Sequence, residues 1–382
     1  MGNARRIAAV WFGVCLFAAL PLAAQDLATP VTTVTQKETP KTDDPNFPAK
    51  GDDFYWVCEL RACGDYVVTI GRNNWLCVFH RDRQTAALKF ASSCSLGYNQ
   101  WDWFLLDTKE LPNQDGAVYV GVKGKLYWLT LDHATGKLAS QGELSAAVDG
   151  VSSITVSPDG GKLYVAGSAK FATFTLDPKT GKPTELTQSA LEGAHLIAGK
   201  GGMLAPNGNL FYACGGNEVF AIAIDPQTGK ATVKSKEKVE GAGTNKWSQP
   251  ALSPDGKFLY VPLATAFAVF ACNSETGVLT SQPDQKLGDI TGVLEMCFAP
   301  DGRSGYFVSQ GEGVKGPASN CVGWFTRDPA TGALTYVGRG PAKGGYTRVV
   351  LDPAAGNLFA LVKLPGKLYS FKTPTFATAN GK

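Results

Sequence analysis

Charged residues are sparse in this chain of 382 residues, at 18% of the total, and no run of lysines or arginines occurs. The formal net charge of +3 is close to neutral for this length. No stripe of basic residues interleaved with aromatic ones is present either. Because nucleic acid is recognised by clustered positive charge, we expect no nucleic-acid partner.

Signatures of common catalytic and cofactor sites are also missing. The chain has three histidines, and no three-histidine or histidine-carboxylate metal spacing is found. It has no Gly-x-Ser-x-Gly nucleophile elbow and no glycine-rich phosphate loop. We therefore expect no metal and no cofactor, so that any chemistry would come from the side chains alone.

The N-terminus has the pattern of a targeting segment. Two arginines at positions 5 and 6 precede the apolar stretch Ile7–Leu20, which is followed by Pro21, a leucine and two alanines. This pattern predicts a signal peptide over residues 1–25, cleaved after position 24 or 25, and hence a secreted or periplasmic protein. An uncleaved membrane anchor is the alternative, since the apolar run through position 24 reaches 18 residues. Pro21 and the alanines favour cleavage, and we expect no other contact with a membrane.

Nine cysteines occur, and eight remain once the signal segment with Cys15 is removed. An even number of cysteines in an exported chain predicts disulfides. The connectivity is open, and the most local candidate pairs are Cys58 with Cys63 and Cys77 with Cys94. Metal binding is the alternative, but no second close pair completes a four-ligand site with Cys58 and Cys63.

Residues 26–52 are rich in threonine, proline, lysine and aspartate, which predicts a linker without helix. Within this linker, every residue of Val31–Thr35 is β-branched. Such residues favour extended backbone, so this segment could form an outer strand of the domain that follows.

One unit of about 48 residues repeats from residue 53 to the end of the chain. Its clearest copy holds a Pro-Asp-Gly turn at 158–160 and an Asp-Pro-x-Thr-Gly hairpin at 177–181. Proline fixes φ in such a turn, and glycine supplies the positive φ that the turn needs. The glycine of the first turn recurs at Gly64, Gly116, Gly160, Gly208, Gly256, Gly302 and Gly356.

The hairpin returns between these turns at 132–136, 225–229, 273–277 and 328–332, with a weaker copy at 82–86. Seven turns in strict alternation with six hairpins predict blades of four antiparallel strands. We therefore predict an all-β fold, a seven-bladed β-propeller over residues 53–382. The last blade lacks an outer strand, which either Phe376–Thr378 or Val31–Thr35 would supply, and this closure would remove a free sheet edge.

The copies at 157–165, 177–181, 225–229, 253–261 and 328–333 resemble the lactonase family of seven-bladed propellers, and the resemblance covers about residues 54–378. It implies hydrolysis of a sugar lactone such as 6-phosphogluconolactone. Similar turns also occur in WD40-like and YVTN-type surface and periplasmic propellers without catalysis. The resemblance is therefore specific for the fold.

Candidate site residues are the polar groups expected at the face opposite the Pro-Asp-Gly turns, where inner strands begin around the central channel. A lactonase needs a base that activates water and a donor that holds the oxyanion. We predict His195 and Glu295 as candidates for the base and Arg348 for the oxyanion donor. Candidate ligand-binding residues stand at comparable positions: Asp102, Trp247, Gln249 and Asn73.

The sequence thus favours an exported propeller, expected to be a monomer, that binds a small lactone or a carbohydrate-derived ligand. If it is an enzyme, the expected class is a hydrolase of lactones and carboxylic esters. The alternative is a non-catalytic propeller that acts as a protein-binding scaffold in the cell envelope. A polar pocket at the channel would favour the first function, and a flat, plugged face the second.

Overall fold

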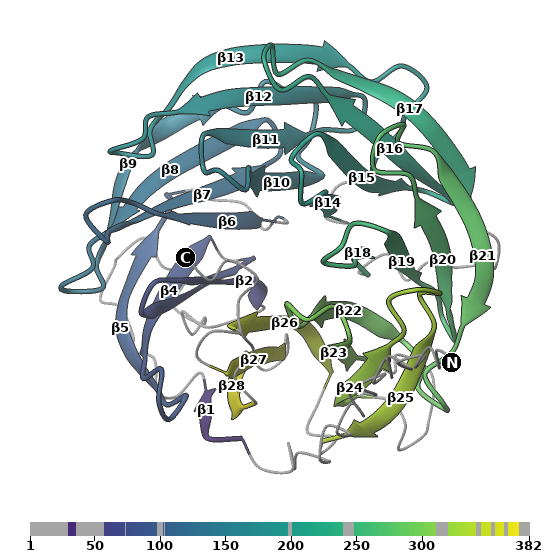
Figure 1. Cartoon of the computed structure of the whole chain (residues 1–382). Helices are drawn as coiled ribbons and strands as arrows, with labels where there is room; N and C mark the ends of the chain where they lie inside the picture. The colour runs from purple at the N-terminus through teal and green to yellow at the C-terminus, as the bar shows by residue number, and fades with distance from the viewer. Residues whose placement is uncertain are drawn as a thin grey trace, which may run out of the picture.

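The computed structural model describes residues 30–35, 57–72, 74–97, 102, 104–197, 201–239, 248–310, 320–340, 345–352, 356–362 and 366–373. These residues form seven sheets of four antiparallel strands each, arranged as blades around a central axis (Figure 1). The protein is therefore an all-β, seven-bladed β-propeller, and no helix occurs in the described ranges. The expected signal peptide, residues 1–25, lies outside them.

The innermost strands of blades 1 to 7 surround the channel: β2 (Val57–Cys63), β6 (Leu105–Glu110), β10 (Ser153–Val156), β14 (Gly202–Leu204), β18 (Ala251–Leu252), β22 (Val293–Phe298) and β26 (Tyr346–Asp352). The second strands follow outward in the same order: β3 (Tyr66–Gly71), β7 (Gly116–Val122), β11 (Lys162–Ala166), β15 (Leu210–Gly215), β19 (Phe258–Pro262), β23 (Ser304–Ser309) and β27 (Asn357–Val362).

The third strands are β4 (Trp75–Arg81), β8 (Lys125–Leu131), β12 (Lys170–Leu176), β16 (Glu218–Ile224), β20 (Phe267–Cys272), β24 (Val322–Arg327) and β28 (Lys367–Lys372). The outer strands form the rim of the disc: β5 (Leu88–Ser95), β9 (Leu138–Ser145), β13 (Pro183–Ala190), β17 (Ala231–Lys238), β21 (Leu279–Gln285), β25 (Leu334–Arg339) and, in blade 7, β1 (Thr32–Thr35).

The second strand of a blade is more deeply buried than the outer strand, because it lies between neighbouring blades and away from the rim of the disc. All seven residues of β7 are buried, so this second strand has an uninterrupted apolar sequence. In contrast, the outer strand β17 alternates between more and less exposed positions, with Ala231 and Val233 on its less exposed face and three lysines on the other. The core is thus a ring of apolar layers between blades rather than a single centre.

The turn glycines have the positive φ that the repeat predicts at six of the seven anchor positions. Blade 2 is the exception, because Gln114 has the positive φ of 70° and Gly116 begins β7. In the weaker hairpin copy of blade 1, Ala86 has a φ of 65° where the other copies have glycine. The repeat therefore tolerates a non-glycine residue in this conformation at two places.

The N-terminal segment closes the ring. Thr32–Thr35 pair with β28 as the outer strand of blade 7, in the register Thr32↔Ser370 to Thr35↔Lys367. Val34 is 5% exposed and packs into the apolar layer between blades 7 and 1. Arg81 of blade 1 also forms an ion pair with Asp352 of blade 7. The other segment considered for this role, 376–378, lies outside the described residues.

The structure corrects the expectation of local disulfides, because it contains none among its eight described cysteines. Cys58 and Cys63 lie five residues apart on the extended strand β2, a separation far beyond the reach of a disulfide. Cys94 pairs with Leu76 and not with Cys77, so the two cysteines project from opposite faces of blade 1. Because of this register, Cys94 packs in the apolar layer between blades 1 and 2, and Cys77 in the layer between blades 7 and 1.

No group of three or more His, Cys, Asp and Glu side chains in the described part of the chain is arranged to hold a metal ion. Within the same ranges, no helix has the length and hydropathy needed to cross a membrane.

Candidate functional site

A cavity of about 510 Å³ lies in the central channel. Residues from the innermost strands of all seven blades, or from the segments just before or after them, line it. Its volume is within the range of ordinary small-molecule sites. The lining includes Pro158 and Pro254, so the cavity extends to the side of the Pro-Asp-Gly turns and not only toward the opposite face, where we expected the site.

Three of the innermost strands carry a β-bulge at the same place, between their first and third residues. The bulges fall at Val57/Glu59 in β2, at Val293/Glu295 in β22 and at Tyr346/Arg348 in β26. A bulge redirects the side chain that follows it. The three bulged strands belong to the consecutive blades 6, 7 and 1, and each delivers a charged residue at the same level of the channel.

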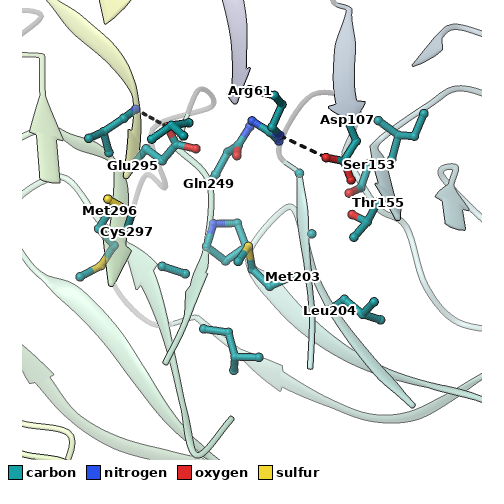
Figure 2. Close-up of a pocket in the computed structure, with 18 of the residues that line it drawn as sticks. Arg61, Asp107, Ser153, Thr155, Met203, Leu204, Gln249, Glu295, Met296 and Cys297 are labelled. Carbon is teal, nitrogen blue, oxygen red and sulfur yellow. Dashed lines mark hydrogen bonds and ion pairs between the residues drawn. The ribbon is translucent and has the colours of Figure 1, made fainter. Parts of the chain in front are cut away.

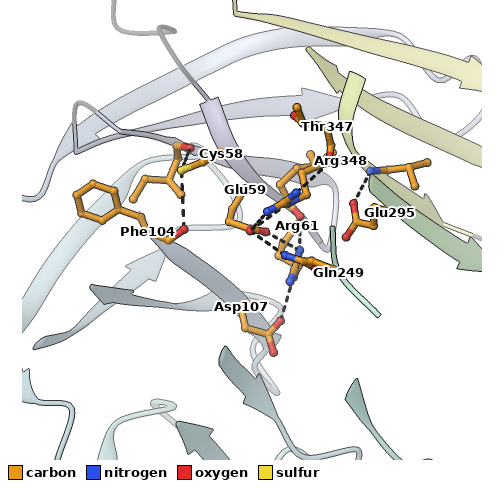
Figure 3. Close-up of polar contacts among 12 residues, drawn as sticks. Cys58, Glu59, Arg61, Phe104, Asp107, Gln249, Glu295, Thr347 and Arg348 are labelled. Atoms are coloured by element: carbon orange, nitrogen blue, oxygen red, sulfur yellow. Dashed lines mark hydrogen bonds and ion pairs between the residues drawn. The ribbon is translucent and has the colours of Figure 1, made fainter. Parts of the chain in front are cut away.

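A buried ion pair joins two of these residues (Figure 3). Arg348 is 2% exposed, and its Nε and Nη2 donate to Glu59 Oε1 at 3.0 and 2.8 Å. Gln249 Nε2 donates to the same oxygen at 3.1 Å, and Arg348 Nη1 donates to the carbonyl oxygen of Thr347 at 2.9 Å. The charge on Glu59, which is 1% exposed, is thus held by donors from blades 5 and 7.

Arg61 extends the network toward blade 2. Its Nη1 lies 3.4 Å from Glu59 Oε2, and its Nε lies 3.6 Å from Asp107 Oδ1. Glu59 and Arg61 are two residues apart on β2, so both side chains project from the same face of the strand into the channel. In Figure 2, Arg61 points toward Asp107 at one side of the cavity.

Asp107 and Glu295 make the same contact across a blade boundary. Asp107 Oδ2 accepts a hydrogen bond of 2.7 Å from the backbone N–H of Val156 in the next blade. Glu295 Oε2 accepts one of 2.7 Å from the backbone N–H of Val349, again in the next blade. In each case one carboxylate oxygen stabilises the packing of two innermost strands.

The second oxygen of Glu295 receives no hydrogen bond from any residue that the structure describes, and the side chain keeps some exposure to the cavity. The surrounding protein raises the pKa of Glu295 to about 7, mainly through loss of solvation, with the Glu59 charge adding to the rise and Arg348 opposing it. Loss of solvation likewise raises the pKa of Asp107. Glu295 can therefore exchange a proton near neutral pH.

The three residues predicted as catalytic do not share one environment. Glu295 lines the cavity, whereas Arg348 lies behind the lining with its guanidinium nitrogens on Glu59 and Thr347. His195 is exposed on the segment between blades 3 and 4 and is not part of the cavity lining. The next residue, Leu196, donates its backbone N–H to the carbonyl oxygen of Ser168 in the loop of blade 3, which fixes this segment against that blade.

The four predicted ligand-binding residues also separate. Gln249 lines the cavity and contacts Glu59. Asp102 precedes β6, outside the cavity lining, and forms an ion pair of 3.0 Å with the exposed Lys123. Asn73 and Trp247 lie outside the described residues.

Sequence reasoning missed Glu59, Arg61 and Asp107. One signal was present in the sequence Val57–Cys63, because Glu59 and Arg61 interrupt an otherwise apolar innermost strand at positions that face one way. Charged residues on a buried strand are rare unless they are paired, so this pattern points to partners across the channel.

No family model matches the chain, and no curated protein matches it either. Solved structures with a similar fold include a "putative 6-phosphogluconolactonase" from Bacteroides uniformis, with 19% identity and a TM-score of 0.57 over 75% of this chain and 84% of that one. One from Bacteroides fragilis with the same description has 18% identity and a TM-score of 0.57 over 75% and 83%. Hydrazine synthase from Kuenenia stuttgartiensis has 14% identity and a TM-score of 0.61 over 88% and 100%. At these identities the likeness shows the propeller fold alone.

Proposed function

We propose that the central cavity binds a small lactone or a related sugar-derived ligand and that Glu295 acts as the general base for its hydrolysis. The observation that carries this proposal is the second carboxylate oxygen of Glu295, which faces the cavity without a hydrogen-bond donor from the described residues. A base with a pKa of about 7 is well matched to proton transfer at neutral pH. Two structures that share the fold are described as "putative 6-phosphogluconolactonase", and we propose the same reaction class, lactone hydrolysis, for this chain.

The reaction follows from the groups around the cavity. Glu295 takes a proton from water, the water oxygen bonds to the lactone carbonyl carbon, and the carbonyl electron pair moves to oxygen. The hydroxyl groups of Ser153 and Thr155, across the cavity in Figure 2, are donors available to that oxyanion. When the intermediate collapses, the ring C–O bond breaks and Glu295 returns the proton to the leaving oxygen, which yields a hydroxy acid.

A hydrolysis screen of the purified protein with gluconolactone and related lactones tests this proposal. We expect turnover whose kcat/KM falls as the pH drops below about 7, because only ionised Glu295 accepts the proton. Glu295→Gln should lower kcat by at least ~100-fold. The matched control is Glu143→Gln, which changes an exposed carboxylate on β9 paired with Lys125. Equal loss in both variants, or none in either, contradicts the role of Glu295.

A second candidate function is a protein-binding scaffold without catalysis. The contacts that favour it are the matching hydrogen bonds of Asp107 and Glu295 across blade boundaries, since a carboxylate that only stabilises the ring needs no ligand. This function becomes the better account if the protein neither binds nor hydrolyses any lactone of the screen.

We also propose that the chain is exported, on the basis of the predicted signal peptide over residues 1–25. N-terminal sequencing of protein recovered from cells that express the whole chain tests this. A start at Gln25 or Asp26 is expected, and a retained Met1 would contradict cleavage.

A further inference from the structure

We infer that the cavity selects an uncharged sugar-type lactone and discriminates against its phosphorylated counterpart. The inference rests on the proposed ligand-binding function and adds the charge class of the ligand. It follows from the balance of charges in the channel and from how each guanidinium is already used.

The charged groups in and directly behind the cavity lining are Arg61, Asp107, Glu295, Glu59 and Arg348. Among the described residues, two guanidinium groups therefore face three carboxyl groups. The described lining includes no lysine. An arriving anion would meet a site without surplus positive charge.

Both guanidinium groups are already engaged by the protein. All three guanidinium nitrogens of Arg348 donate within the structure, two to Glu59 and one to the Thr347 carbonyl oxygen. Arg61 lies between Glu59 and Asp107, and its Nη1 also donates to the carbonyl oxygen of Leu60 at 2.8 Å. A phosphate that binds Arg61 would compete with Glu59 and Asp107 for the same guanidinium, and loss of the Asp107 contact would leave a poorly solvated carboxylate without its cation.

The remaining polar groups of the lining suit a polyhydroxylated, uncharged molecule. Ser153 and Thr155 have hydroxyl groups that make no hydrogen bond with any described residue, and Glu295 has one oxygen to accept from a ligand hydroxyl. Met203 and Leu204 of blade 4 add an apolar surface for the carbon face of a sugar ring (Figure 2). Hydroxyl groups satisfy these donors and acceptors without adding charge.

Calorimetry with gluconolactam, a stable analogue in which an amide replaces the ester, and with its 6-phosphate tests the inference. Gluconolactam should bind at least tenfold more tightly than the phosphate. Equal or tighter binding of the phosphate would overturn the inference, and so would failure of both compounds to bind. If gluconolactam binds but no lactone is hydrolysed, the proposed hydrolysis fails while the charge selectivity stands.

Two variants test whether the charge balance of the cavity lining causes the selectivity. Asp107→Asn keeps an acceptor for the Val156 N–H but releases Arg61, so the preference for the uncharged ligand should narrow about tenfold. The matched control, Asp65→Asn, removes an exposed partner of Arg83. It should leave unchanged the ratio of the dissociation constants of the phosphorylated and uncharged ligands. If Asp107→Asn does not fold, Glu295→Gln measured at pH 8, where Glu295 is mostly ionised, removes a negative charge from the lining and should narrow the preference for the uncharged ligand in the same way. An unchanged ratio in a folded variant contradicts the electrostatic cause.

Discussion

At the scale of single residues, the channel contains charged side chains that are buried and paired with one another. Glu59 and Arg348 are almost completely buried, and they come from the first and last blades of the ring. Such a pair adds little net stability relative to apolar residues, but the loss of one partner is costly because a bare charge then remains inside the protein. The pair therefore fixes how blades 1 and 7 meet at the channel.

Replacement of Arg348 by methionine tests this pairing. The variant should lower the free energy of unfolding by about 3–5 kcal/mol, because Glu59 stays buried without its main cation. The control is Arg83→Met, which breaks the pair with Asp65, where Arg83 is 46% exposed, and should cost less than about 1 kcal/mol. Urea unfolding measures both values, and equal costs would show that burial of the first pair does not matter.

The titration of Glu295 predicts a pH dependence of stability. Its pKa rises from 4.5 to about 7 on folding, so the native state keeps a proton that the unfolded chain loses. The stabilisation from this proton is complete below about pH 4.5 and is lost as the pH rises through about 7. Glu295→Gln removes this dependence. As the pH rises from 4.5 to 8, the free energy of unfolding of the variant should therefore increase by about 3 kcal/mol relative to that of the parent protein. A constant difference across that range, measured by urea unfolding, contradicts the raised pKa.

At the scale of elements, the hairpin glycines connect neighbouring blades as well as turning the chain. Gly181 and Gly97 both have a φ of 69°, but only Gly181 is packed. A Cβ atom on Gly181 would lie 2.5 Å from Ala117 Cβ of the previous blade, whereas a Cβ on Gly97 would meet no atom within 4 Å. The same positive φ thus occurs in a close contact between blades at Gly181 and in an open loop at Gly97.

Alanine at these two glycines separates backbone strain from packing. Gly97→Ala should cost about 1–2 kcal/mol from the left-handed backbone alone. Gly181→Ala should cost about 1–3 kcal/mol more because the added methyl collides with blade 2. Thermal unfolding of the two variants checks the difference, and equal shifts would argue that the hairpins do not make close contact between blades.

The sequence predicts the blades well because each repeat encodes its own turns. Pro158 and Gly160 restrict the backbone locally, whatever the rest of the chain does. The channel is different, because the side chains that meet there come from innermost strands up to 289 residues apart. The bulge before Glu59 redirects the side chain of Glu59 into the channel, and no local sequence pattern predicts this bulge. The position of His195 outside the cavity lining likewise depends on non-local contacts, because its segment bonds to the loop of blade 3.

At the scale of the whole molecule, blade 7 is completed by β1, a strand of four residues from the N-terminal segment. β1 pairs with β28 over Thr32–Thr35, and Val34 is its buried contact with the layer between blades 7 and 1. The closing strand joins segments more than 330 residues apart, so its loss would expose a sheet edge in blade 7. Closure therefore protects the ring from pairing with other chains.

Substitutions in the closing strand test this role. Val34→Asp places a charge in an apolar layer and should lower the free energy of unfolding by about 2–4 kcal/mol, with larger species on gel filtration. Thr33→Asp, on the opposite and more exposed face of the same strand, should change stability by less than about 1 kcal/mol. Equal behaviour of the two variants would mean that β1 does not seal blade 7.

We propose that ligands bind in the channel cavity and not at the outer loops. A crystal structure of the protein with gluconolactam tests it most directly. We predict the ligand between Glu295 on one side and Asp107 and Ser153 on the other, with a ligand hydroxyl on the second oxygen of Glu295. A ligand bound beside His195, outside the cavity, or an empty channel at saturating gluconolactam, would contradict this assignment.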